Sequence, residues 1–148
     1  MHRRAGRLTS LGVVLLALLC GLPIIGRSAE LDSCALLSKA EVAKIIGELK
    51  EEPKPGTGLL KEKQCDYINM SGAWLKISLG NPDTWGMQKG LFVDTVEIKG
   101  LGEEAFSAKR GTAIEVWVRK GNLMLVVSST VGLEPTRKVA EAAAKKLP

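Results

Sequence analysis

Histidine is almost absent from this sequence, because the 148 residues contain only one, His2, near the amino terminus. From residue 30 onward there is none, which excludes Ser-His-Asp and Cys-His catalytic sites, imidazole metal ligands and histidine pH switches from that part. That part also lacks a G-x-S-x-G motif, a phosphate-binding P-loop and a complete dinucleotide fingerprint. We therefore expect no cofactor and no enzyme activity.

Residues 30–148 also lack a large excess of either positive or negative charge. The formal net charge is +5, but Arg3, Arg4, Arg7 and Arg27 all lie in the first 29 residues, which contain no acid. The remainder carries 17 basic and 16 acidic residues. Since a nucleic-acid-binding domain needs a basic surface, we predict no nucleic-acid partner.

Residues 1–29 have the organisation of a secretory signal peptide: a basic start, an apolar run over Leu11–Ile25 and a short polar end. The apolar run has 15 residues, whereas a membrane-spanning helix needs about 20. We expect residues 1–29 to be a signal peptide and residues 30–148 to form one periplasmic or extracellular domain. A membrane contact is expected only if the leader stays uncleaved or Cys20 is lipidated.

The three cysteines fall into two groups. Cys20 lies inside the leader after Leu18-Leu19, where a lipidation signal requires a small residue, so we do not expect a lipid anchor there. Cys34 and Cys65 remain in the exported part, and an isolated pair in an oxidising compartment is most simply a disulfide. The alternatives are two free thiols or a metal site, but two sulfurs without histidine make a poor zinc site, so we predict no metal.

The residue patterns after the leader predict an α+β fold. Ser38 and Glu41 form a capping box before an apolar helical face that Gly47 ends, and Glu134-Pro135 opens a closing helix. Alternating residues between them predict strands joined by short turns, including Gly121-Asn122, with a short edge strand near Leu59-Leu60 and Leu123 to Val131 as the central strand. Short connections require antiparallel neighbours. We predict an antiparallel sheet of five or six strands, flanked on one face by the amino-terminal and carboxy-terminal helices.

Several short motifs together resemble a family of small exported bacterial proteins of unknown function, many of them lipoproteins. The motifs are Cys34-Ala-Leu-Leu-Ser-Lys-Ala-Glu-Val42, then Cys65-Asp-Tyr67, then Gly100-Leu-Gly-Glu-Glu-Ala105 and the hairpin at Arg119–Asn122. The resemblance covers about residues 34–148. It implies an envelope location and a disulfide joining the first helix to the Cys65 strand, and it supplies no catalytic residues.

Tryptophan supplies the candidate binding residues. Trp74 and Trp117 each occupy the polar side of a predicted strand, beside Lys76 in one case and Glu115 and Arg119 in the other. They form either an aromatic patch on an open sheet face or a core beneath a helix. Trp85 lies in a predicted loop and is either a binding finger or a lid over one end of the core.

These observations favour a non-enzymatic binding or interaction domain of the cell envelope whose partner is a protein, a peptide or a small ligand. One alternative is a structural or inhibitor-like module that presents a protruding loop, such as residues 80–90. The other is a hydrolase that uses carboxylates alone. Its acids are Glu103 and Glu104, which we expect to point apart at a turn, and Asp94 and Glu97, which fall on opposite sides of a predicted strand.

Overall fold

A computed structural model describes residues 31–148 of the chain. The predicted signal peptide, with His2 and Cys20, lies outside the described residues. The described part is an α+β fold around one sheet of seven strands in the order β1-β2-β3-β7-β6-β5-β4, with every neighbouring pair antiparallel. The predicted class and the single antiparallel sheet are confirmed, whereas the expected five or six strands were too few.

The elements within residues 31–148 have the following bounds, in chain order: α1 Ser33–Leu36, α2 Lys39–Ile46, β1 Lys54–Thr57, β2 Lys63–Ile68, β3 Trp74–Gly80, the 3₁₀ turn η1 Pro82–Thr84, α3 Trp85–Gly90, β4 Thr95–Glu97, β5 Glu104–Arg110, β6 Ala113–Lys120, β7 Leu123–Ser129 and α4 Leu133–Lys146.

The edge strand β1 explains the error in the strand count. Strand β1 pairs with β2 through the backbone, and its side chains are almost all exposed, so no apolar alternation marks it. The predicted strand near Leu59-Leu60 is wrong because both residues lie in the turn between β1 and β2. The other edge strand, β4, falls within the predicted strand that contains Asp94 and Glu97, and it pairs with β5 over three residues. Edge strands are short and weakly patterned because burial does not constrain both of their faces.

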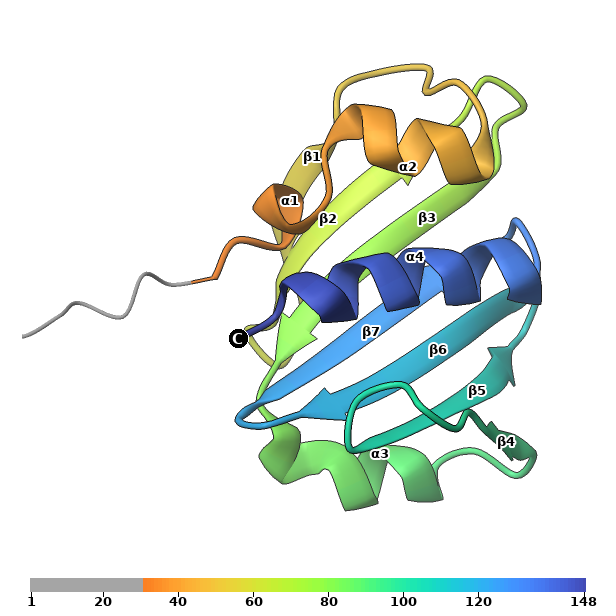
Figure 1. Ribbon diagram of the computed structural model, residues 1–148. Helices are drawn as coiled ribbons and strands as arrows, with labels where there is room; N and C mark the ends of the chain where they lie inside the picture. The colour runs from red at the N-terminus through yellow and green to blue at the C-terminus, as the bar shows by residue number, and fades with distance from the viewer. Residues whose placement is uncertain (1–30) are drawn as a thin grey trace, which may run out of the picture.

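Helices α1, α2 and α4 cover one face of the sheet (Figure 1). The capping box of α2 is present, since Ser38 accepts from the Glu41 amide and the Glu41 carboxylate accepts from the Ser38 amide. Val42 of α2 and Val139 and Ala143 of α4 enter the same core as Leu125 and Val127 of β7. Strand β7 is the fourth of seven and therefore central, as predicted. No helix of residues 31–148 is long and apolar enough to span a bilayer.

A disulfide joins Cys34 of α1 to Cys65 of β2, with 5.0 Å between their Cα atoms. Cys65 is fully buried in the main core, beside Tyr67 on the same strand. The predicted pairing is confirmed. Because the bond joins residues 31 positions apart, it fixes the amino-terminal helix against the sheet and is consistent with an oxidising environment.

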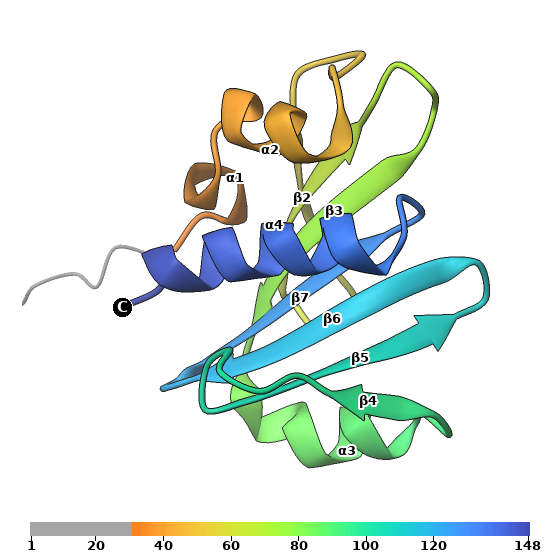
Figure 2. The ribbon, with the colours of Figure 1, turned by 45° about the vertical axis from the view of Figure 1, so that its right-hand side comes forward.

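The short helix α3 lies on the other side of the sheet. Figure 2 shows α3 below β4 and β5 and apart from α4. Trp85 of α3 packs edge-on against Phe106, with 5.3 Å between the ring centroids. Phe106 alternates with Ala105, which belongs to the core under α4, so Phe106 points to the opposite face. The sheet therefore has a second, smaller aromatic core on the face opposite α4.

An ion pair joins α2 to α4 on the face of the sheet that these helices cover. Lys146 Nζ donates to Glu41 at 2.7 and 2.9 Å. This hydrogen bond, with those from the Ser38 amide and hydroxyl, lowers the pKa of Glu41 from its ordinary 4.5 to about 2. Burial raises the pKa of Tyr67 to about 12, and Asp32 and Glu41 add to the effect.

The lowered Glu41 pKa predicts an acid-sensitive contribution to stability. Because the unfolded state binds this proton more tightly, the contribution is complete above pH 4.5 and is lost as the pH falls towards about 2. We expect Glu41→Gln to be less stable than the wild type at pH 6 and equally stable near pH 2. Urea unfolding across this range measures the difference. A constant difference at every pH would contradict the assignment.

Candidate functional site

A hollow on the face opposite α4 is the candidate site, and we call it the sheet-face pocket. Its volume is about 510 Å³, within the range of small-ligand sites. Its floor comes from β2, β3, β7 and β6, including Trp74, Lys76, Val126 and Glu115. The β1–β2 turn forms one wall, and residues of η1 and α3 form another.

Strand register places the floor residues in two rows. Lys76 of β3 is paired with Ser128 of β7, which is paired in turn with Glu115 of β6. The next row on the same face runs Ser78, Val126 and Trp117. Directly opposite residues on neighbouring antiparallel strands lie about 5 Å apart. The pocket floor is thus charged at two positions, with small or apolar side chains between them.

Glu115 is a buried acid with two partners. It is 7% exposed, and its carboxylate accepts from Arg110 Nε and from Trp117 Nε1, both at 2.9 Å. The Arg110 guanidinium also lies 4.8 Å from the centre of the Phe92 ring. A buried carboxylate is costly unless it is paired. Glu115 therefore holds Arg110 and Trp117 in fixed positions at one end of the pocket.

The three tryptophans predicted to bind a ligand lie in two different environments. Trp117 and Trp85 are 5% and 7% exposed and belong to the aromatic core with Phe106, on which Trp117 is stacked at 5.8 Å. Trp85 Nε1 donates to Glu104, so this residue covers the core. Trp74 stays half-buried and lines the pocket together with one edge of Trp117. The three therefore do not form one exposed patch.

The opposite wall of the pocket is the turn between β1 and β2, which several side-chain hydrogen bonds connect. The Leu60 amide donates to the Glu62 carboxylate, Gln64 Nε2 donates to the same carboxylate, and Lys76 Nζ donates to Gln64 Oε1. A Cβ at Gly58 would meet the ends of the flexible Glu62 and Gln64 side chains, so a larger residue there would displace these two groups. This turn holds Leu59 fully exposed at the rim.

Several polar groups of the pocket have no hydrogen-bond partner within residues 31–148. The Ser78 hydroxyl belongs to a residue that is only 9% exposed, and the Ser128 hydroxyl lies next to it on the central strand. The Gln88 side-chain amide and the two terminal nitrogens of Arg110 also have no hydrogen-bond partner among the described residues. Nothing in the sequence pattern distinguished Ser78 and Ser128 from ordinary polar-face residues.

The acids considered for hydrolysis are not arranged as a catalytic pair. Glu103 and Glu104 do not point apart, because Arg119 contacts both, at 3.8 and 2.6 Å respectively. Asp94 and Glu97 are exposed. The expected protruding loop at residues 80–90 is instead η1 and α3, with Asn81 capping the turn and Trp85 packed into the aromatic core.

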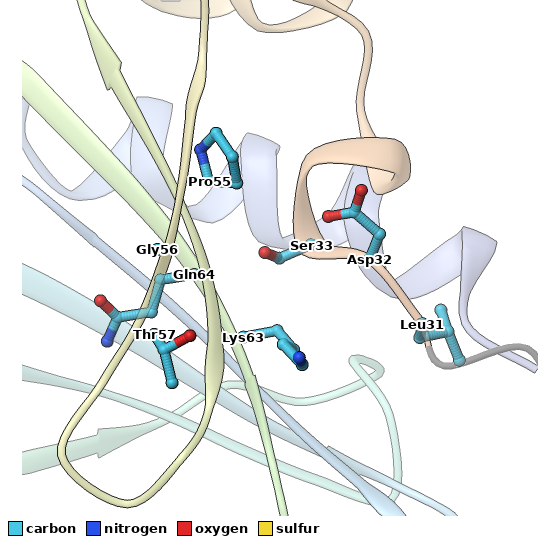
Figure 3. Close-up of a pocket in the computed structure, with 8 residues that line it drawn as sticks. All are labelled: Leu31, Asp32, Ser33, Pro55, Gly56, Thr57, Lys63 and Gln64. Atoms are coloured by element: carbon cyan, nitrogen blue, oxygen red, sulfur yellow. The ribbon is translucent and has the colours of Figure 1, made fainter.

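A second hollow of about 370 Å³ lies between α1 and the edge strand β1. In Figure 3 the Ser33 hydroxyl points toward β1, and within residues 31–148 it is buried without a hydrogen-bond partner. Asp32 is used as the cap of α1, since it accepts from the Cys34 amide. This hollow has no aromatic side chain, and we consider it the weaker candidate.

No protein-family model matches the chain, and no curated protein matches it. Among solved structures, a GTP binding regulator from Thermotoga maritima aligns with a TM-score of 0.49 and 14% identity, over 75% of this chain and 90% of that chain. The comparison assigns neither a ligand nor an activity to the present chain.

Proposed function

We propose that this protein is an exported, non-enzymatic binding domain of the cell envelope that takes its ligand into the sheet-face pocket. The signal-peptide pattern of residues 1–29 and the Cys34–Cys65 disulfide support export. The resemblance to small exported bacterial proteins supports an envelope location. Since the sequence gives Cys20 a poor lipidation context, the domain functions without a lipid anchor.

The observation that carries this proposal is the contrast between the two parts of the face opposite α4. Beneath α3, the rings of Trp85, Phe106 and Trp117 pack in a buried cluster. Beside it, Trp74, Val126 and the two serines of the floor stay open to a hollow of about 510 Å³. An open concave surface with an aromatic floor and a few convergent polar groups is typical of ligand sites. The acid on this floor, Glu115, is paired with Arg110 and Trp117, which favours binding over hydrolysis.

Filling the pocket tests the proposal. The probe is N-phenyl-1-naphthylamine, a neutral aromatic dye whose emission rises in apolar surroundings. We expect saturable binding to residues 30–148, and loss of that binding in Ser128→Trp, where an indole from the centre of the floor occupies the hollow. Dye fluorescence titration measures both.

The matched control is Lys145→Trp, which adds an indole on exposed α4, away from the pocket. It should bind the dye as the wild type does. If Ser128→Trp binds the dye as tightly as the control does, the dye does not occupy the sheet-face pocket and the proposal is wrong.

A further inference from the structure

The pocket's chemistry points to a class of ligand, and this inference rests on the function proposed above. We infer that the sheet-face pocket binds a neutral, hydroxyl-rich ligand, an oligosaccharide, with one sugar ring lying against the indole of Trp74. Three properties of the floor support it: paired charges, uncommitted hydroxyl and amide groups, and a half-exposed tryptophan.

The charges of the pocket compensate one another. Arg110 is paired with Glu115 at 2.9 Å, and Lys76 lies 3.5 Å from Asp66. A strongly anionic or cationic ligand would have to compete with these partners for either charged group. A neutral ligand leaves both pairs intact and still reaches the terminal nitrogens of Arg110, which have no partner among the described residues.

The polar groups that lack a hydrogen-bond partner argue against a fatty acyl chain as the ligand. Ser78 is 91% removed from solvent, and its hydroxyl has no partner within residues 31–148. An alkyl chain lying on β3 and β7 would cover the Ser78 and Ser128 hydroxyls and leave both without water, which is unfavourable. Sugar hydroxyls both donate and accept, so they can replace the water at these two serines and at the Gln88 amide.

Trp74 supplies the apolar surface that a sugar ring requires. Its indole is half-buried and lines both the sheet-face pocket and the adjoining hollow over β2, so the ring lies on the ridge between them. The face of an indole is electron-rich. The C–H bonds on one face of a pyranose carry partial positive charge, and they match such a surface while the hydroxyls project sideways to polar partners.

An extended peptide fits this location less well. Peptides that bind to sheets usually add a strand at an edge, where the backbone groups are unpaired. The edges here are β1 and β4, whereas the pocket floor is centred on β3 and β7, whose backbones are paired on both sides. A peptide in the pocket would contact side chains only and would form no backbone hydrogen bonds with a strand of the sheet.

The test uses two neutral probes, chitotetraose and maltotetraose, and one acidic probe, tetragalacturonate. Tryptophan fluorescence and saturation-transfer NMR with residues 30–148 measure binding. We expect saturable binding of at least one neutral probe and weaker binding of the acidic one. Trp74→Leu, which keeps apolar bulk but removes the aromatic face, should weaken binding at least tenfold. Ser78→Ala combined with Ser128→Ala should weaken it several-fold.

Lys145→Gln, on exposed α4, is the control and should leave binding unchanged. Circular dichroism and urea unfolding establish that the Trp74 and serine variants are folded. If neither neutral tetrasaccharide binds while N-phenyl-1-naphthylamine still does, the sugar inference is wrong and the pocket remains a ligand site. If Trp74→Leu binds the sugar as the wild type does, the assignment to Trp74 is wrong. If neither dye nor sugar binds, both proposals are wrong.

Discussion

Replacing Cys34 and Cys65 together by alanine should lower the free energy of unfolding by about 3–4 kcal/mol, because a cross-link closing a loop of this length restricts the unfolded chain. The two residues are 31 positions apart, and Cys65 is fully buried beneath the helices. Loss of the bond therefore frees α1 from β2 as well as enlarging the unfolded ensemble. Urea unfolding followed by circular dichroism measures the change in midpoint.

Reduction supplies the matched control for this prediction. Dithiothreitol should lower the wild-type midpoint to near that of the double variant and should leave the variant itself unchanged. A wild-type midpoint that does not respond to reductant, with both thiols measured as free, would show that the bond does not form in solution. The argument for an oxidising compartment would then lose its structural support.

Trp117→Ala should destabilise the protein by about 3–5 kcal/mol, the usual cost of truncating a buried aromatic residue. Its indole is stacked on Phe106, packs against Phe92 and donates to Glu115. Truncation removes these contacts and leaves the Glu115 carboxylate with one partner fewer. Trp74→Ala should cost only about 1 kcal/mol, since this residue is half-buried and outside the aromatic core. Thermal and urea unfolding of the two variants give the comparison.

Trp117→Phe separates packing from hydrogen bonding, because it retains a ring over Phe106 but has no N–H for Glu115. It should be intermediate between the wild type and Trp117→Ala. If Trp74→Ala is as destabilising as Trp117→Ala, then Trp74 has a structural role, and its assignment to the binding surface is unsupported.

Local signals in the sequence predicted a large part of the fold. The Ser38–Glu41 capping box and the stop at Gly47 bound α2, and Gly121-Asn122 connects β6 to β7. These features depend on interactions between residues within about four positions of each other, so the local sequence is enough to predict them. The continuous apolar run at the start of β7 likewise predicted a central strand, because a strand in the middle of a sheet is covered over more of both faces than an edge strand is.

Strand β1 and the contacts of Arg119 with Glu103 and Glu104 were missed for the opposite reason. Strand β1 contains Pro55 and Gly56 and has little apolar character, and it exists because β2 offers unpaired backbone groups. Glu103 and Glu104 both reach Arg119, which lies on the neighbouring strand some 15 residues further along the chain. Contacts across that distance depend on strand pairing, and no local pattern encodes them.

The sequence by itself determined the element types, the antiparallel class and the cysteine pair, because hydrophobic period, turn chemistry and composition act over short ranges. Only the tertiary structure decided which tryptophan side chains remain accessible to a ligand. Trp74 and Trp117 occupy equivalent alternating positions beside charged residues on their strands. They differ because α3 packs over Phe106 and Trp117 and leaves the region around Trp74 open. The choice of which part of a sheet a short helix covers depends on the packing of the whole face, so it was not readable from either strand alone.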